Sequence, residues 1–411
     1  MKPTNQILLF LFAVLLLAQC NSCSRMDGFP DSTVLETLDN PEAPNSDSVT
    51  VITTTRYDAG PIKRIFQGWN YRKAWSTPIS VPVIALSTYK GGLLPIKKGG
   101  GKQTLSMDLQ GANGVVYTLR SVTKNPESLI PNYAKRLKIE DLAMDAISAQ
   151  HPYGAVIAAA LADAVEIPHT KPQIVYLPAQ EELGEFNEEF KNRLYLLEYE
   201  PEGSAAWSDM DNVVGLVDTE DVEIELEKNP NAKIDADALV RVRLFDLMIG
   251  DWDRHAKQWG WFAIEEKNNQ VTFVPLPTDR DNAFYNPNGV VPWILTRPYI
   301  ISNLRPFRKQ VDHMPSMIKP FDRVFLLDIP LSKFEAIAAQ LKENLTDEEI
   351  DKAFRSLPTA FLNKDTDKMK KRLKARRENL VSIARSFKKC IDKQGEVKKP
   401  LKGSNRVFVG K

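Results

Sequence analysis

The residues with the clearest capacity for chemistry lie in two short acidic segments of the second half of the chain. The first, residues 250–255, reads Gly-Asp-Trp-Asp-Arg-His, and the second, residues 277–281, reads Pro-Thr-Asp-Arg-Asp. Two acidic loops joined by a short hairpin can place one carboxylate as a base and the others on a divalent cation. Phosphoryl transfer needs this arrangement, because the metal neutralises phosphate charge while a carboxylate orients the attacking hydroxyl. The segments predict a phosphate or metal site, with a structural ion-pair cluster as the alternative.

Other site classes fit the sequence poorly. The four histidines show no short ligand spacing such as His-x-x-x-His, which argues against a zinc hydrolase. No Gly-x-Ser-x-Gly elbow is present for a serine hydrolase. A Walker A loop is excluded because Ile96 stands where its first glycine belongs and Gln103 follows Lys102.

The two acidic segments also resemble a known family. Together with Trp-x-Trp-Phe after the first and Pro-x-Asp-x-Asp-x-x-Phe across the second, they resemble the paired motifs of spore-coat CotH-type kinases. They are similar to the Asp-Arg-His loops of HipA-type and secretory-pathway kinases, which share an atypical protein-kinase fold. The resemblance implies an α+β, two-lobed fold with a β-rich small lobe and a mostly helical large lobe. It also implies phosphate transfer from ATP, with Mg²⁺ or Mn²⁺, to a protein hydroxyl.

The resemblance assigns roles to residues of both acidic segments. Asp253 matches the catalytic-loop aspartate that orients the acceptor, and His255 completes the catalytic motif. Asp279 and Asp281 match the metal-binding pair. Gln258 occupies the place of the metal-binding asparagine, which is a departure from the family pattern.

The nucleotide site implied by the resemblance begins at a glycine-rich turn. Gly99, Gly100 and Gly101, followed by Gln103, look like the turn that covers nucleotide phosphates with its backbone N–H groups. Taken alone, the glycines would more simply be a flexible hairpin tip.

The resemblance also implies a cation that contacts phosphate and a hinge that holds adenine, both later in the sequence. Arg120 falls where the family usually has a phosphate-contacting lysine, and Lys124 could substitute for it. Arginine can clamp phosphate bidentately but is not equivalent to lysine. Asp145 and Glu140 are the candidates for the helix acid that pairs with this cation. Glu198 belongs to the segment Leu-Leu-Glu-Tyr, which resembles the hinge that holds adenine.

The N-terminus predicts export and lipid anchoring. Residues 1–19 carry one lysine and then an apolar run over residues 7–18, which is too short to span a bilayer and fits a signal peptide. The segment Leu-Ala-Gln-Cys resembles a bacterial lipobox and makes Cys20 the predicted lipidation site, with Cys23 as a second candidate. An ordinary secretory signal is the alternative. Residues 20–48 read as anchor and tether, so we expect a protein of the bacterial cell envelope held to a membrane by lipid.

Composition narrows the function classes. The 411 residues are 43% hydrophobic and 26% charged, which excludes a largely disordered or collagen-like chain. The net charge of +1 argues against a dedicated nucleic-acid binder. Three cysteines cannot form a disulfide framework.

The apolar patterns outline the elements that must position the site. Residues 139–165 predict a helical region broken at Pro152, and residues 235–250 predict a long helix. Helices are also expected from Lys333 onward. Strands are predicted over residues 49–56, 105–109, 115–122, 173–177, 193–199 and 271–275.

These elements suggest a small β-rich lobe over residues 49–203, a helical lobe over residues 204–393 and a tail over residues 394–411 that ends in a short strand. Within the helical lobe, residues 368–393 hold eleven basic residues against two acidic ones, with apolar residues at near-helical spacing. The pattern predicts a helix packed on the domain with a solvated basic face, with binding to anionic phospholipid as the alternative.

The expected function is that of a membrane-anchored, kinase-like enzyme with a nucleotide, a divalent metal and an unidentified protein acceptor as partners, and no nucleic acid. A non-catalytic, kinase-like scaffold of the cell envelope is the alternative, supported by Arg120 and Gln258. A metal-dependent phosphohydrolase that uses the same carboxylates is a third possibility.

Overall fold

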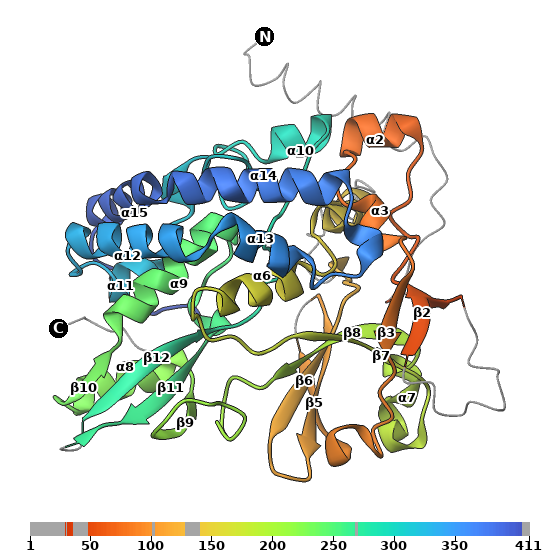
Figure 1. The fold of residues 1–411 in the computed structure, drawn as a ribbon, viewed down its shortest axis with the longest axis horizontal. Helices are drawn as coiled ribbons and strands as arrows, with labels where there is room; N and C mark the ends of the chain where they lie inside the picture. Colours follow the sequence, from red (N-terminus) through yellow and green to blue (C-terminus); the bar gives the residue numbers. More distant parts are fainter. Residues whose placement is uncertain are drawn as a thin grey trace.

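The computed structural model describes residues 29, 31–35, 48–100, 103–127, 140–267 and 270–404. Strands dominate the N-terminal half and helices the C-terminal half (Figure 1), so the predicted α+β fold with a β-rich and a mostly helical part is confirmed. The predicted signal peptide, both candidate lipidation cysteines (Cys20 and Cys23), Gly101 and the strand expected near residue 407 lie outside the described residues.

An antiparallel five-stranded sheet forms the N-terminal part, with the strand order β4-β5-β6-β8-β7. The link between β5 and β6 is an Asn-Gly turn, in which Gly114 has a φ of 79° and Asn113 Oδ1 accepts a hydrogen bond from Val115 N. The strands are β4 (Leu93–Gly100), β5 (Leu105–Gly111), β6 (Val116–Ser121), β7 (Gln173–Leu177) and β8 (Arg193–Tyr199).

The two faces of this sheet serve two hydrophobic cores. Met107 and Leu119 belong to a core confined to the N-terminal part. Leu194 and Leu196 on β8 belong to the main core, which continues into the helical part. Side chains alternate along a strand, so Arg120, paired with Leu196 across the sheet, lies on the face that looks toward the helices.

A second sheet, with the order β10-β12-β11-β9, lies beneath the helices (Figure 1). Its central hairpin joins β11 (Trp259–Glu265) to β12 (Val271–Pro277), and the outer strands are β9 (Val213–Val217) and β10 (Ala232–Ile234). A small third sheet consists of β1 (Thr33–Val34), β2 (Ser48–Ile52) and β3 (Ile79–Pro82).

Helix α6 (Gly154–Asp163) lies between the five-stranded sheet and the helical part. Its alanine-rich, apolar sequence is buried over most of its circumference, as expected for a helix enclosed by a core. The helix α5 (Glu140–Ala146) precedes it, and the chain leaves the helical conformation near Pro152 as predicted.

Helix α9 (Ala236–Ile249) is the centre of the helical part, where it contacts three C-terminal helices and β12. Asp235 caps its N-terminus by accepting a hydrogen bond from Ala238 N. The remaining helices are α2 (Pro61–Gln67), α3 (Arg72–Trp75), α7 (Asn187–Phe190), α8 (Thr219–Lys228), α10 (Val290–Leu295), α11 (Pro320–Phe325), α12 (Leu331–Asn344), α13 (Asp347–Phe354), α14 (Lys364–Glu378) and α15 (Leu380–Gln394).

The basic C-terminal segment packs on the domain. The expected single helix is wrong, because the chain breaks at Asn379 and forms α14 and α15. The predicted packing is confirmed, since the apolar residues of the pattern are buried in the main core: Met369, Leu373, Leu380, Ile383 and Phe387. Within the described part of the chain, no helix has the length and apolar character needed to cross a membrane.

Candidate functional site

The hairpin β11–β12 brings the two acidic segments together. Trp259, the first residue of β11, pairs with Pro277, the last residue of β12. The residues just before Trp259 and just after Pro277 therefore leave the same end of the hairpin. Thr278 N donates a hydrogen bond of 3.0 Å to Gln258 O, which extends the contact into both loops.

The first acidic segment begins where α9 stops. Gly250 adopts a left-handed conformation with a φ of 79°, and the N–H groups of Gly250 and Asp251 both donate to Asp246 O at 2.9 Å. A Cβ atom at position 250 would lie 2.8 Å from Phe307 Cδ2, so the position also requires glycine for space.

Arg254 connects the two segments from within. Its side chain is fully buried and donates to the carbonyl oxygens of Gln258 and Thr278. It also pairs with the carboxylates of Asp251 and Asp246. The arginine of the Asp-Arg-His motif therefore holds both loops in place, a role the sequence does not reveal.

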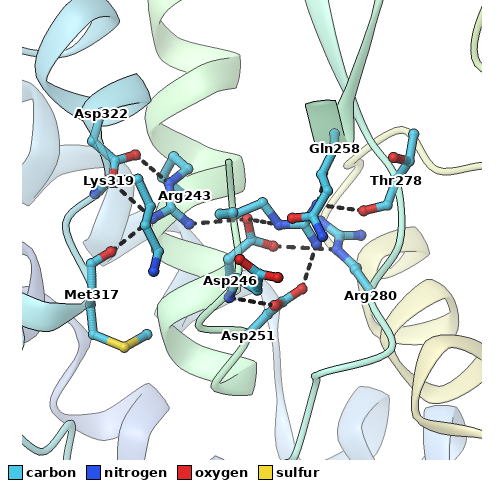
Figure 2. A network of polar contacts seen from close by, with 11 residues as sticks. Arg243, Asp246, Asp251, Gln258, Thr278, Arg280, Met317, Lys319 and Asp322 are labelled. Carbon is cyan, nitrogen blue, oxygen red and sulfur yellow. Dashed lines mark hydrogen bonds and ion pairs between the residues drawn. The ribbon is translucent and has the colours of Figure 1, made fainter. Parts of the chain in front are cut away.

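The ion pairs continue into the helices (Figure 2). Arg280 Nε lies 3.3 Å from Asp246 Oδ1, and Arg243 Nη1 lies 3.2 Å from Asp246 Oδ2. Arg243 also makes a two-point contact with Asp322 at 2.6 and 3.0 Å, which attaches the start of α11 to α9. Burying charges is costly unless they are paired and hydrogen-bonded, so this charge cluster fixes the backbone that presents the acidic segments.

A second cluster joins the five-stranded sheet to the acidic segments. Arg120 Nη2 lies 2.6 Å from Asp279 Oδ1 and 3.4 Å from Asp281 Oδ2. Lys124 Nζ lies 2.9 Å from Asp281 Oδ2, and Arg120 Nη1 lies 3.7 Å from Glu198 Oε2. The structure thus brings together residues from β6, β8, the segment after β6 and the loop after β12. We call these five residues the junction cluster.

The charges of the junction cluster shift its protonation equilibria. Burial favours the neutral form of Asp279, but Arg120 and Lys124 outweigh it and hold the pKa of this carboxyl well below its usual range. Burial opposes the charge of Arg120, yet its carboxylate partners raise the pKa of the guanidinium. Burial raises the pKa of Glu198, against the opposing effects of Arg120 and of the hydrogen bond from Thr170.

The two predicted catalytic residues flank Arg254. The Asp253 side chain is partly exposed, and among the described residues its carboxylate has no hydrogen bond or ion pair. His255 Nδ1 is buried without a hydrogen-bond partner, and burial lowers the pKa of His255 against the charge of nearby Asp253.

The residues around Asp279 supply oxygen ligands of the kind that Mg²⁺ and Mn²⁺ prefer. Gln258 Oε1 is buried without a hydrogen-bond partner, and Gln258 Nε2 lies 3.4 Å from Asp279 Oδ2. The described residues contain no group of three histidine, cysteine or acidic side chains placed to hold a metal. Mg²⁺ usually takes one or two carboxylates and completes its shell with water and substrate phosphates. The donor set of Asp279, Asp281 and Gln258 fits that pattern.

Asp279 has an unusual backbone conformation. Its φ is 52°, in the left-handed region that residues other than glycine rarely occupy. Aspartate is among the side chains that tolerate this region best. The conformation turns the chain sharply between Thr278 and Asp281, so that both carboxylates meet the cations of the sheet.

The glycine-rich turn lies near the junction cluster. Gly99 and Gly100 form the end of β4, where Gly100 pairs with Leu105. Gln103 O accepts a hydrogen bond of 2.8 Å from Asn125 N, the residue that follows Lys124. Gln103, which precedes β5, is therefore in contact with the residue next to Lys124.

Of the two candidates for the helix acid that pairs with Arg120, Asp145 is wrong. It pairs instead with Arg72 and, at 3.0 Å, with Lys63. The side chain of Glu140 lies outside the described residues. The acidic partner on the sheet is Glu198, which the sequence pattern assigned to the hinge. Strand register was the signal that could have identified it, since Glu198 pairs with Thr118, two residues before Arg120 on the same face.

Two small cavities flank the junction cluster. One is lined by Glu198, Asp279 and Arg280 together with α6, and the other by Lys124 and Asp281 together with His151 and Gln150. Each has about 10 Å³ of space, close to the volume that one water needs. The polar walls suit bound water beside the carboxylates.

Comparison with known proteins gives a likeness of fold. No protein-family model and no curated protein matches the chain. Among solved structures, the chain is similar to the crystal structure of the Helicobacter pylori proinflammatory kinase CtkA, with a TM-score of 0.39 and 14% sequence identity. The likeness covers 75% of this chain and 99% of that kinase.

Proposed function

We propose that the chain is a kinase-like phosphotransferase that binds ATP with Mg²⁺ or Mn²⁺ and transfers phosphate to a hydroxyl of a protein acceptor. The observation that carries the proposal is the junction cluster, in which Arg120 on β6 and Lys124 just after it meet the Asp279–Asp281 pair of the hairpin loop. Binding of a nucleotide phosphate requires cationic side chains, and binding of its divalent metal requires carboxylates. The junction cluster contains both kinds of group.

Each residue has a distinct task in this proposal. The carboxylate of Asp253 accepts a hydrogen bond from the acceptor hydroxyl and orients it toward the phosphate. Arg120 and Lys124 leave their carboxylate partners to contact phosphate oxygens. Asp279 and Asp281, with Gln258, hold the metal, which when bound neutralises phosphate charge.

A non-catalytic, kinase-like scaffold is the second candidate, and one observation favours it. Arg120 Nη2 lies 2.6 Å from Asp279 Oδ1, so a side-chain cation already neutralises a carboxylate that catalysis requires for the metal. If this ion pair persists in the presence of nucleotide, the protein would keep its fold and its surfaces without transferring phosphate.

The proposal also places the protein at a membrane of the bacterial cell envelope. Its support is the sequence of the first twenty residues, in which a short apolar run precedes Cys20 in a lipobox-like segment. Acyl chains on Cys20 would hold the folded part close to the membrane through the tether.

The test is the thermal stability of the purified protein with Mn²⁺ and ATP, combined with transfer of labelled phosphate. A ligand at 100 times its Kd that binds only the folded state should add about 2.7 kcal/mol to stability. We expect this shift in the wild type and its loss in Asp279→Asn. The matched control is Asp367→Asn, because the Asp367 side chain is 71% exposed on α14 and its ion pair is with Lys370 of the same helix.

The outcomes separate the alternatives. No shift in the wild type would contradict nucleotide binding. A shift without labelled protein and without phosphate release would favour the scaffold. A shift with phosphate release to water alone would identify a phosphohydrolase.

A further inference from the structure

A groove separate from the junction cluster lies between α2, α10 and α14, which are neighbours in Figure 1. Its volume is about 670 Å³, within the range of pockets that hold ligands of several hundred daltons. Its walls carry apolar and basic side chains, namely Ile65, Trp293, Ile294, Pro306, Arg308 and Arg372.

The apolar side chains of the groove are unusually exposed. Ile65 is 59% exposed and Trp293 is 53% exposed. Ile62 on α2 is 63% exposed, and Trp69 just beyond this helix is 62% exposed. A cluster of large apolar side chains in contact with water marks an interaction surface more often than isolated ones do.

The walls of the groove are held rigidly. A Cβ atom on Gly289 would lie 2.4 Å from Gly68 N, so the backbones at the end of α2 and the start of α10 are in direct contact. Asn288 Oδ1 accepts a hydrogen bond of 2.7 Å from Trp69 N. The guanidinium of Arg297 lies 3.8 Å from the centre of the Trp293 ring and fixes the indole. A preformed groove loses little entropy when it binds a ligand.

The charge of the groove is positive. Both charged residues that line it are arginines, Arg308 and Arg372. Arg372 Nη1 donates to Asn286 Oδ1 and to Phe307 O, and its Nε and Nη2 have no hydrogen-bond partner among the described residues. Arg308 is 46% exposed and has an ion pair of 3.5 Å with Asp312. Both guanidinium groups retain donors for an incoming carboxylate.

We propose that this groove binds an acidic segment of a partner protein that carries one bulky apolar side chain. The apolar side chain lies between Ile65 and Trp293, and neighbouring carboxylates pair with Arg308 and Arg372. A hollow with donors on its wall matches a peptide better than it matches the flat surface of a bilayer. Binding requires neither nucleotide nor metal, so the inference is independent of phosphate transfer.

The test uses fluorescein-labelled peptides with the sequence Gly-Asp-Glu-X-Glu-Asp-Gly, where X is Phe, Leu or Trp. Fluorescence anisotropy with the purified full chain, without nucleotide or metal, gives the affinity. We expect saturable binding that weakens about tenfold in Ile65→Glu and in Arg308→Glu, a change of about 1.4 kcal/mol each. Both side chains are exposed, so these variants keep the fold.

Matched controls are Leu94→Glu, at a side chain that is 67% exposed on β4, and Arg355→Glu, at an exposed residue after α13. Both should bind within about twofold of the wild type. Peptides with Lys for the acidic residues, or Ala at X, should bind more weakly. Equal binding by Ile65→Glu and Arg308→Glu, or no saturable binding up to about 1 mM, would overturn the proposal. So would binding to phosphatidylglycerol vesicles that these two variants lose while no peptide binds.

Discussion

Arg254 and Arg120 are both paired with carboxylates, but the two pairings differ in their exposure to water. Arg254 and its partners are fully buried, whereas the side chains of Arg120 and Asp279 keep 18% and 31% of their surface exposed. Removing Arg254 would leave buried carboxylates without a partner, at a cost of about 3–5 kcal/mol. The Arg120–Asp279 pair is partly solvated, so its partners can exchange at lower cost. At the scale of residues, Arg254 positions the loops and Arg120 is the cation free to change partners.

Glu200, the first residue after β8, has a carboxyl that titrates near neutral pH. Burial, reinforced by Asp108 and Glu202, raises the pKa of Glu200 to about 7 against the hydrogen bond from Thr118 Oγ1. The folded-state pKa lies above the unfolded value, so the stability that the proton contributes is present at low pH and is lost as pH rises toward 7. Glutamine mimics the protonated form. We expect the stability of Glu200→Gln relative to wild type to increase by about 2 kcal/mol between pH 5 and pH 8.

Urea unfolding at both pH values measures this difference. Glu188→Gln is the matched control, because the side chain of Glu188 is 83% exposed, and its stability relative to wild type should not change with pH. A parallel pH dependence of wild type and Glu200→Gln would show that Glu200 is already ionised in the folded protein.

At the scale of elements, the end of α9 requires a glycine at position 250. Gly250 combines a φ of 79° with close contact to Phe307, whereas Gly114 in the turn between β5 and β6 has the same φ of 79° and open space around it. Gly114→Ala should therefore cost about 1 kcal/mol, for the positive φ alone. Gly250→Ala should cost about 1–3 kcal/mol more, because its new methyl group is also overpacked. Denaturant unfolding of the two variants checks the prediction, and equal losses would contradict it.

Local sequence patterns predicted the position of many helices and strands. Where the prediction failed, tertiary contacts determine the bounds of the element. The bounds of β7 and β8 match the prediction because their apolar runs end at clear polar or proline-containing segments. The break at Asn379 was missed because the apolar spacing continues from Leu373 to Leu380 without a helix-breaking residue. Helical periodicity cannot show where packing turns a chain.

The part of the site that nearby residues form could be predicted from the sequence, whereas the part that separate elements form could not. The two acidic segments lie close in sequence, so a hairpin suffices to bring Asp253 and Asp279 near each other. The pairing of Arg120 with Glu198 depends on sheet register, and that of Arg243 with Asp322 spans 79 residues. No local signal encodes these contacts, because they form only when separate elements pack.

At the scale of the whole molecule, the five-stranded sheet divides two cores. One face packs with the loops and short helices of the N-terminal part, and the other contributes to the core that runs through α9 and the C-terminal helices. Units with separate cores can open separately in the folded state. The junction cluster therefore joins two parts whose stabilities can be changed independently.

Met107→Ala tests this independence. The Met107 side chain is fully buried in the smaller core, so the variant should lose about 2–5 kcal/mol of local stability. Amide hydrogen exchange should become faster in β4, β5 and β6 and stay unchanged in α12 and α15. Leu247→Ala, in the main core, is the matched control and should speed exchange in the helices. Equal acceleration in both parts for both variants would show a single cooperative unit.

The buried charge cluster has a consequence for the response of the protein to ionic strength. It contains three guanidinium groups and three carboxylates, from Arg243, Asp246, Asp251, Arg254, Arg280 and Asp322, and none is more than 5% exposed. Dissolved ions screen exposed charges over a Debye length of about 8 Å at physiological salt, but they do not enter a dry, electrically balanced interior. Rising salt therefore weakens the partly solvated attraction between the sheet and the acidic loops while the loops keep their shape. At high salt, the contact between the two lobes can therefore weaken while the conformation of the acidic loops stays the same.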